Sequence, residues 1–194
     1  VSAYGENHDA AAAILDEFTN EVTARLAGYV FSINGETMEE VLGGLLRERN
    51  FSLATAESCT GGLIAHRITN VPGSSSCFFE GVISYSNEAK EQILGVPHEL
   101  LVEHGAVSGP VVEAMARGVR NLSGSDIGVA VSGIAGPTGG SPEKPVGTVF
   151  IGTDSASHGT RSEKFLFHGT REEIKLATSS RAIMTVMQIL LNNV

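Results

Sequence analysis

Hydrophobic residues recur along the chain at two spacings, one typical of helices and one of strands. In the first segment they return every fourth position, at Ile14, Phe18, Val22 and Leu26. This spacing predicts a helix over residues 10–26 with one apolar face, and residues 29–33 predict a short strand before a turn. One helix and one strand do not bury their own apolar surface. We therefore expect residues 1–35 to be an extension that packs on the main domain, on a second copy, or on a part outside this sequence.

Residues 36–194 have the pattern of a layered α/β domain. Apolar runs predict five strands, at residues 51–56, 78–85, 127–132, 146–153 and 163–167. Segments with helical spacing lie between most of these strands. Two more helices, one before the first strand and one after the last, begin with the Thr-x-x-Glu spacing of a capping box, at Thr37 and Thr170. Strands that alternate with helices predict an α/β fold. No helix separates the last two strands, so we expect them to be antiparallel and the sheet to be mixed but mostly parallel.

Composition and charge narrow the class of protein. The chain has 194 residues, of which 42% are hydrophobic, which suffices for one well-packed domain. It carries 13 basic and 22 acidic residues, a formal charge of −9, without a basic cluster, so nucleic acid is not the expected partner. No apolar run reaches the roughly 18 residues of a membrane span, and the first twenty residues do not resemble a secretory signal. We therefore expect a cytoplasmic protein with no membrane partner.

Cysteine and histidine usage predicts neither disulfides nor a metal centre. Cys59 and Cys77 are too few for a disulfide framework. The six histidines are scattered and form no His-x-His or His-x-x-x-His pair, and no Cys-x-x-Cys occurs. The sequence therefore gives no reason to expect a metal.

The first candidate for chemistry is residues 56–62, which read AESCTGG and directly follow a predicted strand. Small residues between a strand and a helix leave several backbone N–H groups facing one concavity, which suits an oxyanion or phosphate. Ser58 lies at the apex of this turn as a candidate nucleophile, with Cys59 as its rival. Alternatively, Ser58 or Thr60 caps the helix and Cys59 is a buried, inert thiol. Spacing alone favours the cap.

The second candidate is residues 84–90, which read SYSNEAK at the end of another predicted strand. Lys90 falls in the first turn of a helix that Ser86 caps, where the helix dipole disfavours an ammonium. Burial lowers the pKa of a lysine further, and a neutral lysine is a competent general base. Tyr85 lies close enough in sequence to reach the same cavity. The alternative is a solvated surface lysine beside a tyrosine packed at the rim, and taken alone this alternative is favoured.

The third candidate is the glycine-rich stretch at residues 133–140, after the third predicted strand. It matches neither the P-loop pattern nor the dinucleotide-binding pattern. An anion-binding nest and a long turn are both open at this point.

Six segments together resemble the C-terminal domain of the CinA family. They are residues 56–62 (AESCTGG), 72–75 (PGSS), 84–90 (SYSNEAK), 104–108 (HGAVS), 132–137 (SGIAGP) and 144–149 (KPVGTV). They occur in the order and spacing of that family and cover about residues 37–191. Six concerted motifs are far more specific than any one alone.

The resemblance implies a function. Members of this family are nicotinamide-nucleotide amidases, which hydrolyse nicotinamide mononucleotide to nicotinate mononucleotide and ammonia in pyridine-nucleotide recycling. Their serine nucleophile is served by a lysine and a tyrosine, which correspond to Ser58, Lys90 and Tyr85. The resemblance also implies a three-layer α/β/α sandwich, homo-oligomers, and an amidase without cofactor or metal.

The implied mechanism makes further residues candidates for substrate binding. We expect backbone N–H groups at Thr60, Gly61 and Gly62 to hold the oxyanion. The substrate phosphate is expected on the loop that contains Gly133, Gly136 and Thr138, near Arg171 or Lys175. Members of the family often carry an arginine where Lys175 stands, whereas Arg171 matches their pattern.

Two alternatives remain beside the amidase. In the first, the domain is a non-catalytic nucleotide-binding or oligomerisation module of a CinA protein. In the second, it acts in DNA uptake or repair, a role that its acidic charge disfavours. Residues 1–35 resemble the end of the middle region that precedes this domain in longer members. Those members also carry an N-terminal domain linked to metal-dependent ADP-ribose pyrophosphatase activity, which we do not assign to this chain.

Overall fold

The five strands form one mixed sheet in the order β2-β1-β3-β4-β5 in the computed structural model, which describes residues 2–26 and 29–191. The strands are β1 (Leu53–Glu57), β2 (Phe78–Ile83), β3 (Ile127–Gly133), β4 (Thr148–Ser155) and β5 (Gly159–Leu166). Strand β1 pairs in parallel with β2 and β3, and β4 is antiparallel to both β3 and β5. The predicted mixed sheet with an antiparallel final pair is confirmed; β4 is the strand that runs against the other four.

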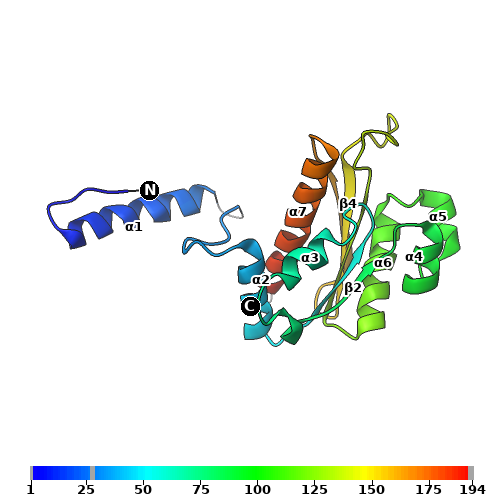
Figure 1. Cartoon of the computed structure of the whole chain (residues 1–194), viewed down its shortest axis with the longest axis horizontal. Coiled ribbons are helices and arrows are strands. Elements are labelled where there is room, and N and C mark those ends of the chain that lie inside the picture. The colour runs from blue at the N-terminus through cyan, green and yellow to red at the C-terminus, as the bar shows by residue number, and fades with distance from the viewer. Residues whose placement is uncertain (1, 27–28, 192–194) are drawn as a thin grey trace.

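Helices cover both faces of the sheet, as Figure 1 shows. They are α2 (Met38–Glu48), α3 (Leu63–Thr69), α4 (Asn87–Leu94), α5 (His98–His104), α6 (Gly109–Ser123) and α7 (Arg171–Leu191). The described chain also contains helix α1 (His8–Arg25), which lies outside these layers, and a short 3₁₀ helix at Ser74–Ser76. Helices α2, α3 and α7 pack together on one face, and α4, α5 and α6 on the other. The three-layer α/β/α sandwich is therefore confirmed.

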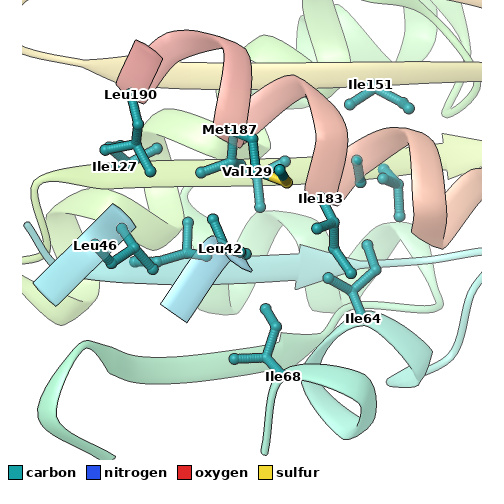
Figure 2. Close-up of a cluster of buried hydrophobic side chains, with 14 of the residues drawn as sticks. Leu42, Leu46, Ile64, Ile68, Ile127, Val129, Ile151, Ile183, Met187 and Leu190 are labelled. Atoms are coloured by element: carbon teal, nitrogen blue, oxygen red, sulfur yellow. The ribbon is translucent and has the colours of Figure 1, made fainter. Parts of the chain in front are cut away.

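The larger apolar core lies between the sheet and α7 (Figure 2). Ile183, Met187 and Leu190 of α7 are buried there against the sheet, together with Leu42 and Leu46 of α2. Within the described ranges, α7 is the one helix that is long and apolar enough to cross a membrane. Its buried residues pack into this core, so we interpret it as the central helix of a layered domain.

Local hydrogen bonds set the helix ends that the sequence predicts. The Glu40 carboxylate accepts from the Thr37 N–H at 2.7 Å, and the Thr37 hydroxyl accepts from the Glu40 N–H at 3.3 Å. Thr170 and Glu173 make the same pair of bonds before α7. Both capping boxes are thus confirmed.

Residues 29–33 differ from the prediction, because they form no strand. No strand in the described part of the chain pairs with them, and an isolated extended segment has no ladder to hold it. None of the described residues of α1 is buried, and Figure 1 shows this helix apart from the sheet. The division at residue 35 stays a prediction.

Strand β5 also differs from the prediction, since it begins at Gly159 rather than near residue 163. Its first half reads GTRS and is mostly solvated, because β5 is an edge strand with little apolar alternation. Pairing with β4, rather than hydrophobic patterning, defines where it starts.

The order of the strands reverses at β1. The chain leaves β1 through α3 toward β2 on one side, and returns from β2 through α4, α5 and α6 to β3 on the other. Such a reversal of strand order is where open α/β sheets bind their ligands. The segments that follow β1, β2 and β3 are the three candidate segments of the sequence.

Candidate active site

Ser58 lies in a tight turn directly after β1. Its N–H donates to the carbonyl of Val131 on β3 at 3.1 Å, and its own carbonyl accepts from the Gly61 N–H at 3.1 Å. Gly61 and Gly62 have φ values of +63° and +93°, in the left-handed region that favours glycine. The two glycines therefore let the chain turn sharply into α3 and leave Ser58 at the carboxyl end of β1.

Lys90 is buried beside this turn, with 1% of its surface exposed. Its Nζ lies 3.3 Å from the Ser58 Oγ. Three backbone carbonyls surround the same nitrogen, those of Ser84 at 2.8 Å, Tyr85 at 3.4 Å and Ser86 at 3.4 Å. The structure thus brings together the predicted nucleophile and base, although 32 residues separate them in sequence.

Burial controls the protonation of Lys90. Loss of solvent lowers the pKa of its ammonium from the usual 10.5, against the smaller opposing effects of Cys59 and Glu88. A neutral amine has two N–H groups and one lone pair, so it can donate to two carbonyls and accept from the Ser58 hydroxyl. This arrangement suits a general base that takes the hydroxyl proton.

The rival nucleophile is not activated. Cys59 is 6% exposed, and burial raises the pKa of its thiol to about 12. A thiol must ionise to be an effective nucleophile. Of the two neighbours, Ser58 is therefore the group that the site can activate.

Glu57 is a site residue that the sequence analysis missed. It closes β1 and is 1% exposed, and its carboxylate accepts from the N–H groups of Gly62, Ile64 and Ala65 at 2.8–3.1 Å. The available signal was a charged residue at the end of an otherwise apolar strand, directly before the candidate nucleophile.

These bonds alter the expected oxyanion site. The Gly62 N–H donates to Glu57 and the Gly61 N–H donates to Ser58, so neither is free for a substrate. Thr60 is completely buried, and its hydroxyl has no partner among the described residues. Of the three predicted amides, that of Thr60 donates to no protein oxygen within the described residues and lies within reach of the Cys59 sulfur.

The Tyr85 side chain is largely exposed and contacts Arg171. It is 63% exposed, and its hydroxyl accepts from an Arg171 N–H at 3.2 Å. Its backbone carbonyl, rather than its phenol, faces Lys90. In the structure Tyr85 therefore joins the nucleophile region to Arg171.

Two cations of α7 lie at the mouth of this region. Arg171 also donates to the Gly136 carbonyl at 2.8 Å, which ties α7 to the glycine-rich loop after β3. The Lys175 Nζ approaches Gly61, at 3.9 Å from the position of an added Cβ. A hollow of about 420 Å³ is lined by Thr170, Arg171, Glu172 and Lys175. Its two cations suit an anionic ligand group.

The remaining predicted residues take different positions. Gly133 ends β3, where a side chain would collide with Val149 and the Thr148 carbonyl, so close packing explains this glycine. Thr138 is exposed, and no hydrogen bond joins it to the other predicted residues within the described ranges. In those ranges, no group of three His, Cys, Asp or Glu side chains could hold a metal ion.

Comparison with known proteins decides the family. The model of the CinA C-terminal domain matches residues 35–190. The chain belongs to the CinA family. A CinA-like protein from Geotalea uraniireducens is 53% identical over 180 residues, which are 92% of this chain and 43% of that protein. A CinA-like protein from Geobacter metallireducens is 48% identical over 98% of this chain and 46% of its own length.

The CinA fold is also seen in solved structures. The competence/damage inducible protein CihA from Agrobacterium tumefaciens superposes with a TM-score of 0.74 at 39% identity, over 81% of this chain and 98% of its own. This chain spans somewhat less than half the length of the two CinA-like relatives. What the longer CinA proteins do as a whole is thus not carried over to it.

Proposed function

We propose that this CinA domain is an amidase that hydrolyses nicotinamide mononucleotide to nicotinate mononucleotide and ammonia. The observation that carries the proposal is the 3.3 Å separation between the Ser58 Oγ and the Nζ of a buried Lys90. A serine beside a lysine of lowered pKa is an arrangement suited to acyl transfer. The substrate class follows from the family resemblance.

Acylation begins with proton transfer. Neutral Lys90 takes the proton of the Ser58 hydroxyl as the oxygen attacks the carboxamide carbon. The tetrahedral oxyanion accepts hydrogen bonds from unengaged backbone amides of the turn, each worth about 3–4 kcal/mol in comparable sites. Lys90, now an ammonium, returns the proton to the leaving nitrogen, and ammonia departs. We assign this step to Lys90 because its Nζ lies 3.3 Å from the Ser58 Oγ, where the bond to the carboxamide forms.

Deacylation repeats the same proton transfers with water. The neutral amine of Lys90 takes a proton from a water molecule that attacks the ester carbon on Ser58. Collapse of the second tetrahedral intermediate breaks the bond to the Ser58 oxygen, which regains its proton from Lys90. The products are nicotinate mononucleotide and a regenerated serine.

Arg171 and Lys175 support a phosphorylated substrate. Their side chains line one hollow, and Arg171 also reaches the loop that the sequence analysis proposed for the phosphate. A guanidinium binds phosphate oxygens through charge-assisted, often bidentate hydrogen bonds. Nicotinamide mononucleotide would place its phosphate here and its carboxamide at Ser58.

Three further predictions belong to this proposal. We expect a homo-oligomer, a cytoplasmic setting and a role in pyridine-nucleotide recycling. Both cysteines are free and buried, which agrees with a compartment where thiols stay reduced.

The direct test is ammonia release by the purified protein from nicotinamide mononucleotide and from nicotinamide riboside, without added metal. We expect release from both and a preference for the phosphorylated compound. A folded protein that binds the mononucleotide and releases no ammonia would support the non-catalytic module instead. Salt-sensitive binding of DNA without amidase activity would support the role in DNA uptake or repair.

Arg171→Gln is predicted to remove most of the preference for the phosphorylated substrate. We expect kcat/KM for the mononucleotide to fall about 10- to 100-fold, as for loss of a hydrogen bond to a charged group, and that for the riboside to change little. Arg161→Gln, an exposed arginine on β5, is the matched control. Equal losses with both substrates would contradict a phosphate contact at Arg171.

The activity is predicted to rise with pH. Lys90 must be neutral to act as base, so kcat/KM should increase tenfold per pH unit below its lowered pKa and level off above it. Measurement above pH 7 keeps the substrate phosphate a dianion. The midpoint should lie below the ordinary lysine value of 10.5. A profile that falls as pH rises, or a midpoint at or above 10.5, would argue against a buried lysine base.

A further inference from the structure

Glu57 carries a buried negative charge that the mechanism above does not use. It is 1% exposed and directly precedes Ser58. A buried carboxylate is costly unless it is compensated. The compensation here comes from backbone amides at the start of α3: Oε2 accepts from Gly62 at 3.0 Å and Ile64 at 3.1 Å, and Oε1 accepts from Ala65 at 2.8 Å.

These bonds fix the shape of the nucleophile turn. The side chain of Glu57 spans from the end of β1 to the first turn of α3 and encloses residues 58–61 between its two anchors. Ser58 lies inside this closed segment, whose two ends cannot move independently while the three bonds hold. The orientation of the Ser58 hydroxyl toward Lys90 therefore depends on the Glu57 carboxylate.

The same bonds determine which amides remain for a ligand. Gly62 is taken by Glu57, and Gly61 is taken by the Ser58 carbonyl. The N–H groups of Cys59 and Thr60 both lie within hydrogen-bond reach of the Cys59 sulfur. Glu57 therefore removes the Gly62 amide from the groups that could hold an oxyanion.

We propose that Glu57 is the positioning residue of this site, which holds Ser58 against Lys90 and keeps the Gly62 amide from the oxyanion. The inference rests on the proposed acyl transfer at Ser58. Because Glu57 occupies the amino end of α3, that helix end binds neither the oxyanion nor the substrate phosphate.

The backbone of Glu57 extends this role to the base. Its carbonyl accepts from the Ser84 N–H at 2.9 Å, and the Ser84 carbonyl accepts from the Lys90 Nζ at 2.8 Å. The end of β1 thus supports the nucleophile through one contact and the base through another. A shift of Glu57 would change the distance between Ser58 and Lys90 from both sides.

The test compares Glu57→Gln with Glu40→Gln. Glutamine keeps the size of Glu57 but turns one acceptor oxygen into an NH₂ group, which faces a backbone N–H. Glu40 also caps a helix through a backbone N–H, at α2, and is exposed. Measurements are the thermal midpoint, kcat and KM for the mononucleotide, and the rate at which an arylsulfonyl fluoride modifies Ser58.

We expect Glu57→Gln to lower kcat about 100-fold, the effect of displacing a reacting group by about 1 Å. The KM should stay within about threefold, because Arg171 is untouched, and sulfonylation should slow with kcat. Glu40→Gln should change stability but leave kcat within about twofold. A folded Glu57→Gln protein with kcat within twofold of wild type, or a loss matched by Glu40→Gln, overturns the inference.

Two measurements distinguish a failure of this inference from a failure of the amidase proposal and from misfolding of the variant. Sulfonylation needs no carboxamide, so equal rates in wild type and Glu57→Gln overturn the positioning role even if the mononucleotide is not a substrate. Amide NMR of the wild-type protein needs no folded variant. In the Ser58 adduct, the Gly62 amide proton should keep its chemical shift, because it stays bound to the Glu57 carboxylate. A Gly62 amide proton that shifts on sulfonylation contradicts the assignment.

Discussion

Ser58→Ala is expected to lower kcat/KM for ammonia release from nicotinamide mononucleotide by about 10⁴-fold or more, since a nucleophile is lost that its neighbours cannot replace. Cys59 is buried, and the pKa of its thiol is raised to about 12, so it stays protonated. The measurement is a coupled ammonia assay at saturating and limiting substrate.

Ser75→Ala is the matched control for this variant, because Ser75 is exposed and lies outside the site. Its activity should equal that of the wild type. The Ser58→Ala protein should keep the thermal midpoint and still bind the mononucleotide through Arg171. If it retained more than about a tenth of the activity, Ser58 would not be the nucleophile.

Lys90→Met is expected to reduce kcat/KM by about 10²- to 10⁴-fold, the usual contribution of a positioned general base. Methionine fills a similar volume in the buried position but accepts no proton from Ser58. The residual activity should also lose the rise with pH, because that rise reports the ionisation of Lys90 itself.

Lys164→Met serves as the control for Lys90→Met, since Lys164 is an exposed lysine on β5. It should leave both the rate and the pH profile unchanged. A Lys90→Met protein whose residual activity followed the wild-type pH profile would show that another group is the base.

Much of the fold could be predicted because local chemistry and long-range packing agree. Thr37 and Thr170 begin helices through short-range bonds that the spacing to Glu40 and Glu173 already specifies. Residues 29–33 show the opposite case, since a strand needs a neighbour and the described chain supplies none. Periodicity identifies a segment, whereas pairing decides whether it becomes a strand.

The candidate site could be predicted only in part. Spacing alone favoured a helix cap at Ser58 and a solvated Lys90, and the family motifs pointed to catalysis instead. The contact between the two joins residues 32 positions apart, so it depends on the order of β1, β2 and β3 in the sheet. No local pattern in the sequence contains that order.

Glu57 was missed for a related reason. A carboxylate at the end of a strand is ordinarily solvated. Its burial follows from the position of α3, whose first amides return to the end of β1. The same bonds engage the Gly62 amide, which had been predicted to hold the oxyanion.

The measurement that tests the account most directly is peptide mapping of the enzyme quenched in acid during turnover of nicotinamide mononucleotide. An intermediate bound through an ester should appear on the Ser58 peptide, in an amount matching the initial burst of ammonia. A burst without acylation of that peptide, or an acyl group on any other side chain, would contradict the central claim.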